Sequence, residues 1–281
     1  DLRARLHLGA NAGNEHRVDQ LALAWDRLQA SGTARIASSA PMQLDAALQL
    51  TQQGTPTLPA WNASATLAGP LAEPLLQATL RAAAAPERAA QSLDLRAALR
   101  PFAAWPLGEL HMNAQAIDLS AFSSAAPATA LSGSAVAQSS GADQPASLSA
   151  ELTNALPGRW NEGKLPAHRL ALELAARPDQ PSTLTLRRLD AALGTPTSNA
   201  GQLAGHGRWS PDGWALDANL VDVQPALLDA RAPTLRASGP LTLSGSGTTV
   251  EVKADLGGPV QGLKPVRVMQ FKVDATLAPK R

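Results

Sequence analysis

The chain has 281 residues, with 24 basic and 23 acidic side chains and a formal net charge of +1. Its basic residues are dispersed and aromatic residues make up only 3% of it, so it lacks the basic patch and stacking platforms typical of nucleic-acid-binding proteins, and no nucleic-acid partner is expected. The absence of cysteine excludes a disulfide scaffold and thiolate chemistry. No apolar run reaches the roughly eighteen residues that a membrane-spanning helix needs. Because the chain opens at Asp1 rather than at a methionine, we expect it to be a fragment of a longer protein.

Apolar and polar residues alternate along most of the chain, in runs separated by Gly, Pro, Ser and Asn. The first run places leucine or alanine at every second position from Leu2 to Leu8. Later runs follow, in chain order, at 42–50, 61–67, 76–80, 93–99, 110–114, 148–152, 170–174, 214–220, 250–256 and 271–277. This period of two predicts strands with one apolar and one polar face. With the weaker stretches included, the sequence predicts an all-β protein of about fifteen strands.

Helix is the rival interpretation for two segments. Alanine-rich RAAAAPERAAQ at 81–91 has high helix propensity, although Pro86 interrupts it and Leu93, Leu95 and Leu99 return to a period of two. The second segment is Gln224–Asp229, where a proline near the first helical position predicts a single helical turn.

A short turn separates the two tryptophans of GRWSPDGWALDANL, residues 207–220. Ser210-Pro211-Asp212-Gly213 has the residue types of a tight turn, because proline presets φ and glycine accepts a positive φ. Residues that flank such a turn face each other across an antiparallel pair. We therefore expect Trp209 and Trp214 to lie side by side on one face of a hairpin.

Short related segments recur along the chain, such as AGPL at 68–71 and SGPL at 238–241. Repeated strand pairs predict a structure that grows along one axis by adding similar units. We interpret residues 1–281 as one elongated β-repeat region, with a weak break near the Ser- and Ala-rich residues 123–166.

Catalytic chemistry is not indicated. The five histidines show neither metal-ligand spacing nor a neighbouring carboxylate in the sequence pattern, and three of them, His7, His111 and His206, fall on polar strand faces. We therefore expect no enzyme activity, no catalytic residue, no metal site and no cofactor.

About fifteen strands with one apolar face each allow three architectures. A sandwich would pack the apolar faces into a dry core, but the apolar positions are mainly Leu and Ala, whereas sheet cores are usually bulkier. A membrane barrel would turn these faces to lipid, but the chain has few aromatic residues for interfacial girdles. A long sheet folded over on itself would line a groove with them.

Five strand-and-turn segments stand out: SGTARIASSAPMQLDAALQL (31–50), ATLAGPLAEPLLQATL (65–80), WPLGELHMNAQAIDLSAF (105–122), GQLAGHGRWSPDGWALDANLVDVQPALL (201–228) and TLRASGPLTLSG (234–245). They resemble the TamB family of translocation and assembly module subunits, within the AsmA-like superfamily. The resemblance implies a long antiparallel-type sheet curled into a taco- or U-shaped groove with an apolar interior. It also implies a Gram-negative periplasmic protein, anchored in the inner membrane by a segment outside this chain.

The function implied by this resemblance is a non-catalytic bridge between the two membranes. Its partners would be phospholipid acyl chains and a TamA-like Omp85 barrel in the outer membrane, and it would support outer-membrane protein assembly, autotransporter secretion and phospholipid transport. Alternatives are a chaperone-like holder of unfolded outer-membrane proteins by β-augmentation, and an extracellular β-rich adhesin domain. The expected groove-lining residues are Leu44, Leu48, Trp61, Leu67, Leu95, Leu110, Met112, Leu148, Leu172, Trp209, Trp214, Leu216, Leu220, Val250, Val252, Phe271 and Val273.

Overall fold

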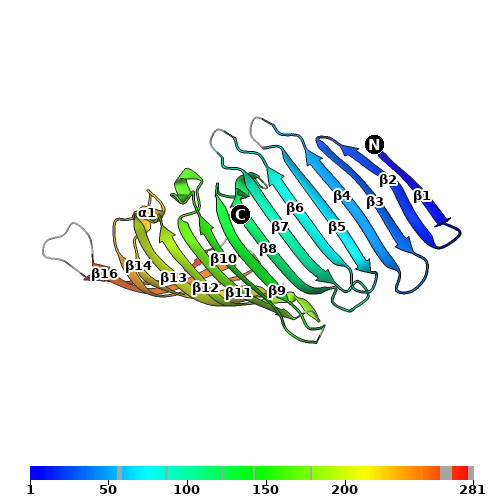
Figure 1. Cartoon of the computed structure of the whole chain (residues 1–281). Coiled ribbons are helices and arrows are strands. Elements are labelled where there is room, and N and C mark those ends of the chain that lie inside the picture. Colours follow the sequence, from blue (N-terminus) through cyan, green and yellow to red (C-terminus); the bar gives the residue numbers. More distant parts are fainter. Residues whose placement is uncertain are drawn as a thin grey trace. The chain divides into compact units, whose positions relative to one another are not determined.

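The structure is a computed structural model that describes residues 1–55, 59–85, 88–121, 123, 125–141, 143–177, 179–247, 249–259 and 268–277. It is all-β, as the alternating sequence predicts, and its seventeen strands belong to one antiparallel sheet (Figure 1). No second sheet is present among the described residues. The alternating sequence predicts about fifteen strands, two fewer than the structure contains among its described residues.

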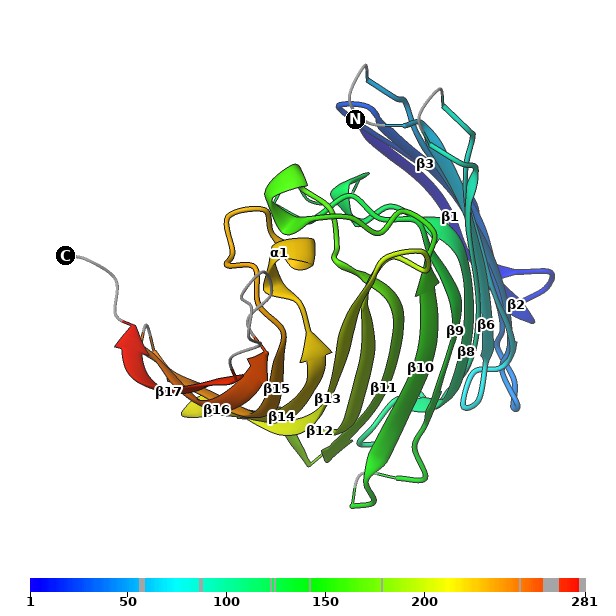
Figure 2. The ribbon, with the colours of Figure 1, turned by 90° about the vertical axis from the view of Figure 1, so that its left-hand side faces the viewer.

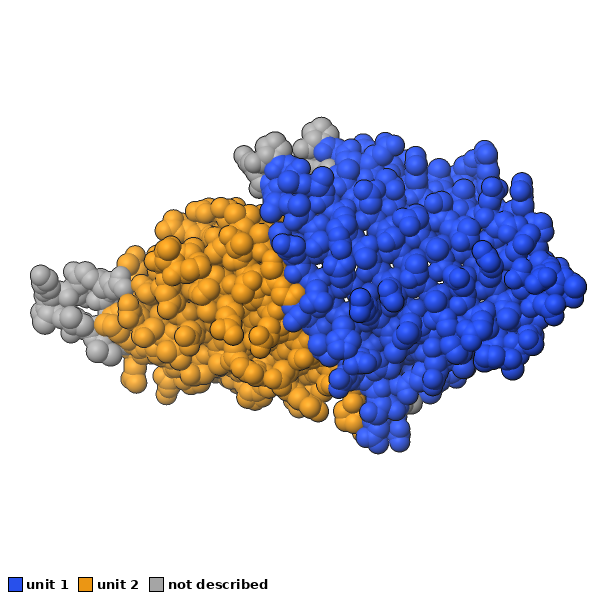
Figure 3. All heavy atoms as spheres, viewed as in Figure 1, with its two compact units in different colours: residues 1–117, 134–144 blue, residues 118–133, 145–281 orange. Residues whose placement is uncertain are grey.

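The residues group into two compact units, which Figure 3 shows in blue and orange. Unit 1 comprises residues 1–117 and 134–144, and unit 2 comprises residues 118–133 and 145–281. Two of the boundaries, 133/134 and 144/145, lie inside the segment 123–166 in which a weak break was expected.

Unit 1 is a meander in which each strand pairs with the next one in sequence. Strictly alternating sequences joined by short turns favour such antiparallel neighbours, because a hairpin needs only a few connecting residues. The strands are β1 (Leu2–Ala10), β2 (Glu15–Trp25), β3 (Leu28–Ala37), β4 (Gln43–Gln52), β5 (Trp61–Pro70), β6 (Leu75–Ala82), β7 (Gln91–Leu99) and β8 (Leu107–Ile117). The next strand, β9 (Leu131–Gln138), is divided between the two units.

Unit 2 contains a second meander with the same neighbour pairing. Its strands are β10 (Ala146–Asn154), β11 (Ala167–Arg177), β12 (Gln180–Gly194), β13 (Asn199–Ser210), β14 (Gly213–Val223), β15 (Ala237–Ser246), β16 (Thr249–Pro259) and β17 (Val268–Leu277). Its short helices are the 3-10 turns η1 (Leu119–Ala121) and η2 (Trp160–Glu162) and the single α-helical turn α1 (Pro225–Leu228). In Figure 2 the strands of unit 2 bend along their length, and α1 lies on the concave side.

The two segments for which helix is the rival interpretation have different outcomes. The turn predicted at Gln224–Asp229 is confirmed as α1, with Pro225 at its first position. The helix considered at 81–91 is wrong: β6 continues to Ala82, β7 begins at Gln91, and an isolated bridge pairs Ala85 with Arg88 between them. Pro86 itself lies outside the described residues. The pairing of β6 with β7 overrides the helix propensity of alanine.

The tryptophan hairpin forms as predicted. Trp209 on β13 pairs directly with Trp214 on β14, and Ser210 pairs with Gly213, so the connecting loop has two residues, Pro211 and Asp212. The Ser210 hydroxyl donates to the Gly213 carbonyl oxygen at 3.0 Å.

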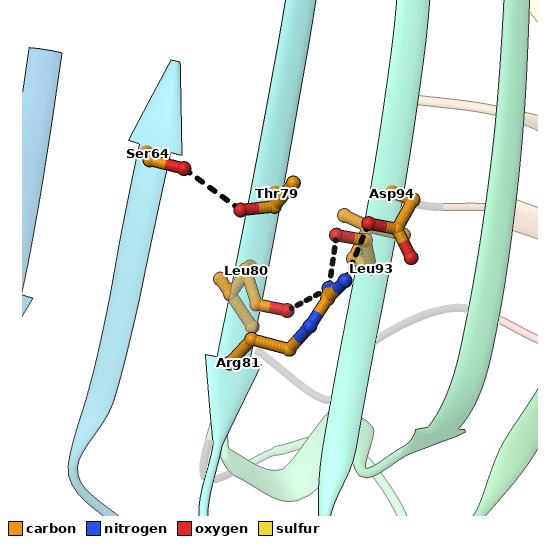
Figure 4. Close-up of polar contacts among 6 residues, drawn as sticks. All are labelled: Ser64, Thr79, Leu80, Arg81, Leu93 and Asp94. Carbon is orange, nitrogen blue, oxygen red and sulfur yellow. Dashed lines mark hydrogen bonds and ion pairs between the residues drawn. The ribbon is translucent and has the colours of Figure 1, made fainter.

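Polar side chains on the opposite face of the sheet bond across strands. In the part of unit 1 shown in Figure 4, the Ser64 and Thr79 hydroxyls lie 2.8 Å apart on β5 and β6. Arg81 donates from Nη2 to Asp94 Oδ1 on β7 at 2.6 Å, and from Nη1 to two main-chain carbonyl oxygens. These side chains keep this face hydrated and hold neighbouring strands in register.

Candidate functional site

The apolar face of unit 1 is continuous across its strands. Residues that pair across an antiparallel ladder point to the same face, so the strand register identifies this face without ambiguity. One row of paired residues consists of Gly32, Leu48, Ala65, Ala78, Leu95 and Met112, and the next row consists of Ala34, Ala46, Leu67, Leu76, Ala97 and Leu110. Leu44 and Trp61 occupy the same face in the rows toward the two strand ends. All seven expected lining residues of unit 1 thus share one face.

The apolar face of unit 2 is built by the same rule. Its central rows are Leu148, Leu174, Leu186, Gly207, Leu216, Leu243, Val252 and Ala275, and Ala150, Leu172, Leu189, Gly205, Ala218, Leu241, Ala254 and Val273. Trp209, Trp214 and Val250 follow in a third row, while Leu220 pairs with Leu203 and Phe271 with Leu256. The ten expected lining residues of unit 2 therefore share its apolar face.

The expected lining residues are not packed into a dry core. Of the seventeen, fourteen are half-buried, Trp209 and Val273 are exposed, and only Leu220 is buried. Trp209 keeps 56% of its surface accessible. Among the described residues, the buried apolar ones are mostly alanines, whose small side chains are shielded by their neighbours in the sheet. A second layer packed on these faces would have buried the leucines as well.

A hollow of 310 Å³ lies on the apolar face of unit 1. Its lining includes four small residues, Gly32, Ala34, Ala46 and Ala65, next to larger aliphatic residues. A Cβ atom at Gly32 would lie 2.8 Å from the Ala47 carbonyl oxygen, so this position cannot carry a larger side chain without movement. The larger residues are Val18, Leu21, Leu48, Leu67 and Leu76, and the remaining lining is Thr33, Ala47 and Thr66.

Sequence reasoning identified only Leu48 and Leu67 among the residues of this hollow. The sequence does not mark the small residues of this hollow, because an alanine or glycine on an apolar strand face carries no chemical signal of its own. What distinguishes these residues is their position. The strand register brings Gly32, Ala34, Ala46 and Ala65 side by side on the apolar face of neighbouring strands.

Larger hollows lie on the polar faces. One of 770 Å³ in unit 1 is lined in part by Arg3, Arg5 and Asp19, and one of 370 Å³ in unit 2 is lined in part by Arg188 and Asp190. These are troughs between long, exposed and mutually paired side chains, such as Arg188 with Asp190. Because water already satisfies such groups, we assign the candidate site to the apolar hollow and not to these larger troughs.

Part of the apolar face of unit 2 is covered by its own chain. The turn α1 contacts β12 and β13, and the apolar-face residues Ala191 and Leu220 are each only 8% exposed. The loop that carries α1 is tied to η2, since the main-chain N–H of Ala230 donates to Asn161 Oδ1 at 2.8 Å. Leu220, expected to line an open groove, is instead part of this small core.

Three histidines have carboxylate neighbours, which corrects the expectation that none does. His7 Nε2 lies 2.9 Å from Asp19 Oδ2, His111 Nε2 lies 2.8 Å from Glu109 Oε1, and His206 Nε2 lies 4.0 Å from Asp217 Oδ2. Glu109 and His111 are two positions apart on one strand, so the sequence already contained that signal. The other two pairs form across strands. Within the described residues, no group of three or more potential metal ligands comes together.

Comparison with known proteins assigns no family. No protein-family model, no curated protein and no solved structure matches this chain. None of the helices in the described ranges is long and apolar enough to span a membrane. The fold and the surface define the chain as an all-β protein with one antiparallel sheet and a half-exposed aliphatic face in each unit.

Proposed function

We propose that the apolar faces bind the acyl chains of phospholipids. The observation that carries this proposal is the half-burial of an aliphatic face that runs across consecutive strands, with a hollow of 310 Å³ lined by Leu, Val, Ala and Gly. Contiguous exposed apolar surface of this kind is typical of sites that bind protein or lipid. An acyl chain exposed to water costs roughly 0.8 kcal/mol per CH₂, so an aliphatic surface can lower this cost without any chemical reaction.

In the wider form of the proposal, the chain is part of a non-catalytic periplasmic bridge between inner and outer membranes. The bridge supports phospholipid transport and outer-membrane protein assembly, including autotransporter secretion, together with a TamA-like Omp85 barrel. This form rests on the resemblance of segments such as 31–50 and 201–228 to the TamB family. The all-β sheet and its aliphatic faces are compatible with it.

Lipid extraction and mass spectrometry of the purified chain test the proposal. The matched variants are Leu48→Arg, at the apolar hollow, and Gln49→Arg, on the opposite face of the same strand. We expect phospholipid to co-purify with the native chain and with Gln49→Arg, and to be reduced at least about tenfold in Leu48→Arg, because a charge in contact with hydrocarbon is costly. Equal lipid in the two variants, or none in the native chain, contradicts acyl-chain binding.

A second candidate function is the holding of unfolded outer-membrane proteins by β-augmentation. Two observations on β1 favour this function. The strand pairs with β2 on one side, and its side chains Leu2, Leu6 and Leu8 are exposed. A strand edge of this kind offers main-chain hydrogen bonds to an added strand. Protection of β1 amides from hydrogen exchange by an unfolded outer-membrane protein, with no protection by lipid vesicles, would favour this function over the first.

A further inference from the structure

The last described strand, β17, has a charge pattern that is complementary to itself. Lys272 and Asp274 lie on its polar face, on either side of Val273 on the apolar face. Among the ladders that the described residues form, β17 pairs with β16, and Figure 2 shows β17 as the outermost strand of the unit 2 series. In an antiparallel pair of two β17 strands centred on Val273, each Lys272 would lie opposite an Asp274 of the other copy. Unlike charges directly opposite each other stabilise an antiparallel pair.

The same charge rule already operates inside the sheet. Across the β16–β17 ladder Lys272 pairs with Asp255, and Asp274 pairs with Lys253. The Lys272 Nζ atom lies 3.7 Å from Asp255 Oδ2, and the lysine side chain remains 83% exposed, so it has room for a second acidic neighbour. Thus β17 pairs with β16 through unlike charges that alternate along the strand. The same Lys272 and Asp274 side chains are available to a strand that pairs with the other edge of β17.

The apolar face matches in the same register. Pairing centred on Val273 brings each Phe271 opposite an Ala275 of the other copy, so a large side chain faces a small one. Val273, which is 42% exposed, would then face its own counterpart. Registers centred on Lys272 or Asp274 would instead place like charges opposite each other, and a shift by one residue would mix the polar and apolar faces.

The other outer strand, β1, does not have this property. Its polar positions are Arg3, Arg5 and His7, and Arg3 already bonds Asp1 at 2.9 Å. Antiparallel self-pairing centred on Ala4 would place Arg3 opposite Arg5, and pairing centred on Arg5 would place that arginine opposite itself. Positive side chains on an edge strand oppose such association.

We propose that two copies of this chain associate through the free edge of β17, in an antiparallel pair centred on Val273. The interface is isologous, so each contact occurs twice. It extends the sheet of one copy into the sheet of the other through main-chain hydrogen bonds, and the two Lys272–Asp274 pairs select the register. This interaction surface does not depend on the proposed acyl-chain binding.

Cysteine cross-linking tests the register directly, because the chain has no cysteine of its own. In Val273→Cys the two introduced thiols would face each other at a Cα separation that permits a disulfide. The control is Val221→Cys. Val221 is 44% exposed, close to the exposure of Val273, but it lies on β14, which has a strand paired on each side. We expect at least about tenfold more disulfide-linked dimer from Val273→Cys under the same mild oxidation. Equal yields from the two variants would overturn the proposal.

Charge reversal tests the pairs that select the register. Lys272→Glu should weaken the dimer at least about tenfold in sedimentation experiments up to about 100 μM, because both interfacial pairs become like-charged. Since this change also affects the contact with Asp255, a second variant reverses all four charges, Lys253→Asp, Asp255→Lys, Lys272→Asp and Asp274→Lys. It keeps every unlike pair and should dimerise as the native chain does. The proposal is refuted if the native chain stays monomeric over this concentration range. It is also refuted if the variant with all four charges reversed folds but does not dimerise.

Discussion

The indole of Trp214 lies directly over Gly245, its partner across the β14–β15 ladder. A Cβ atom built at Gly245 would fall within contact of the indole Nε1, Cε2 and Cζ2 atoms. Gly245 is buried beneath this ring. The aromatic side chain thus takes the space that any other residue at 245 would need.

We therefore predict that Gly245→Ala displaces the indole and destabilises the protein by about 1–3 kcal/mol, the usual cost of overpacking. Thermal denaturation and the tryptophan emission maximum measure the two effects. In a Trp214→Leu background the same glycine change should cost much less, because the ring that clashes is gone. An identical cost in both backgrounds would show that the indole is not the obstacle.

Leu216 tests whether the apolar face of unit 2 is open. It is half-buried and pairs with Gly207 on one side and Leu243 on the other. We expect Leu216→Arg to fold, because the longer side chain can extend from a single-layer sheet, but to lose co-purified lipid. Circular dichroism melting and lipid mass spectrometry are the measurements, and a loss of folding would indicate a closed core.

The control for Leu216→Arg needs care. Asp217, its neighbour on the polar face, accepts a hydrogen bond from the Thr242 hydroxyl at 2.9 Å and lies near His206. Replacing Asp217 would remove these contacts and could by itself lower the stability of the fold. Asn219→Arg, on the same polar face but exposed, is the better match. It should leave both melting temperature and lipid content nearly unchanged.

Asn154 joins three main-chain segments of unit 2. Its Oδ1 accepts from the N–H groups of Ala130 at 3.0 Å and Leu156 at 3.1 Å, and its Nδ2 donates to the Ala167 carbonyl oxygen at 3.0 Å. The side chain is buried. Asn154→Ala should therefore lower the free energy of unfolding by roughly 2–4 kcal/mol, because buried main-chain groups lose their partners. Chemical denaturation measures this, and a change below about 1 kcal/mol would contradict the role.

Asp229 and Arg231 form a bidentate pair in the loop after α1. The guanidinium donates to Oδ1 at 2.9 Å and to Oδ2 at 2.6 Å, and this hydrogen bonding lowers the pKa of Asp229 from 3.8 to about 2. A lowered pKa means that the pair stabilises the folded loop above pH 3.8, and that this contribution is lost as the pH falls toward 2. Carboxyl-detected NMR titration should give a midpoint near 2 for the native chain and a higher one for Arg231→Gln. An unchanged midpoint in the variant would exclude the guanidinium as the cause.

Much of the local structure was predictable from single segments. Period-two alternation placed the strands, Pro225 marked the start of α1, and the turn residues between Trp209 and Trp214 set these two rings opposite each other. The seventeen expected lining residues also share an apolar face within each unit, because alternation and pairing both have a period of two. Such features depend on residues close together in sequence, whose geometry is the same in any antiparallel sheet.

Other features depend on contacts between segments that are distant in the sequence, and no single segment predicts them. The helix propensity of 81–91 yields to the pairing of β6 with β7, and Asp19 reaches His7 across a strand pair whose register shifts. Leu220 is buried, whereas Leu216, on the same strand and the same face, stays half-buried. The turn α1 contacts the nearby strands β12 and β13 of the same sheet. Alternation along a strand determines which face a side chain occupies. It does not determine what covers that face, because covering it requires segments whose positions follow from the whole fold.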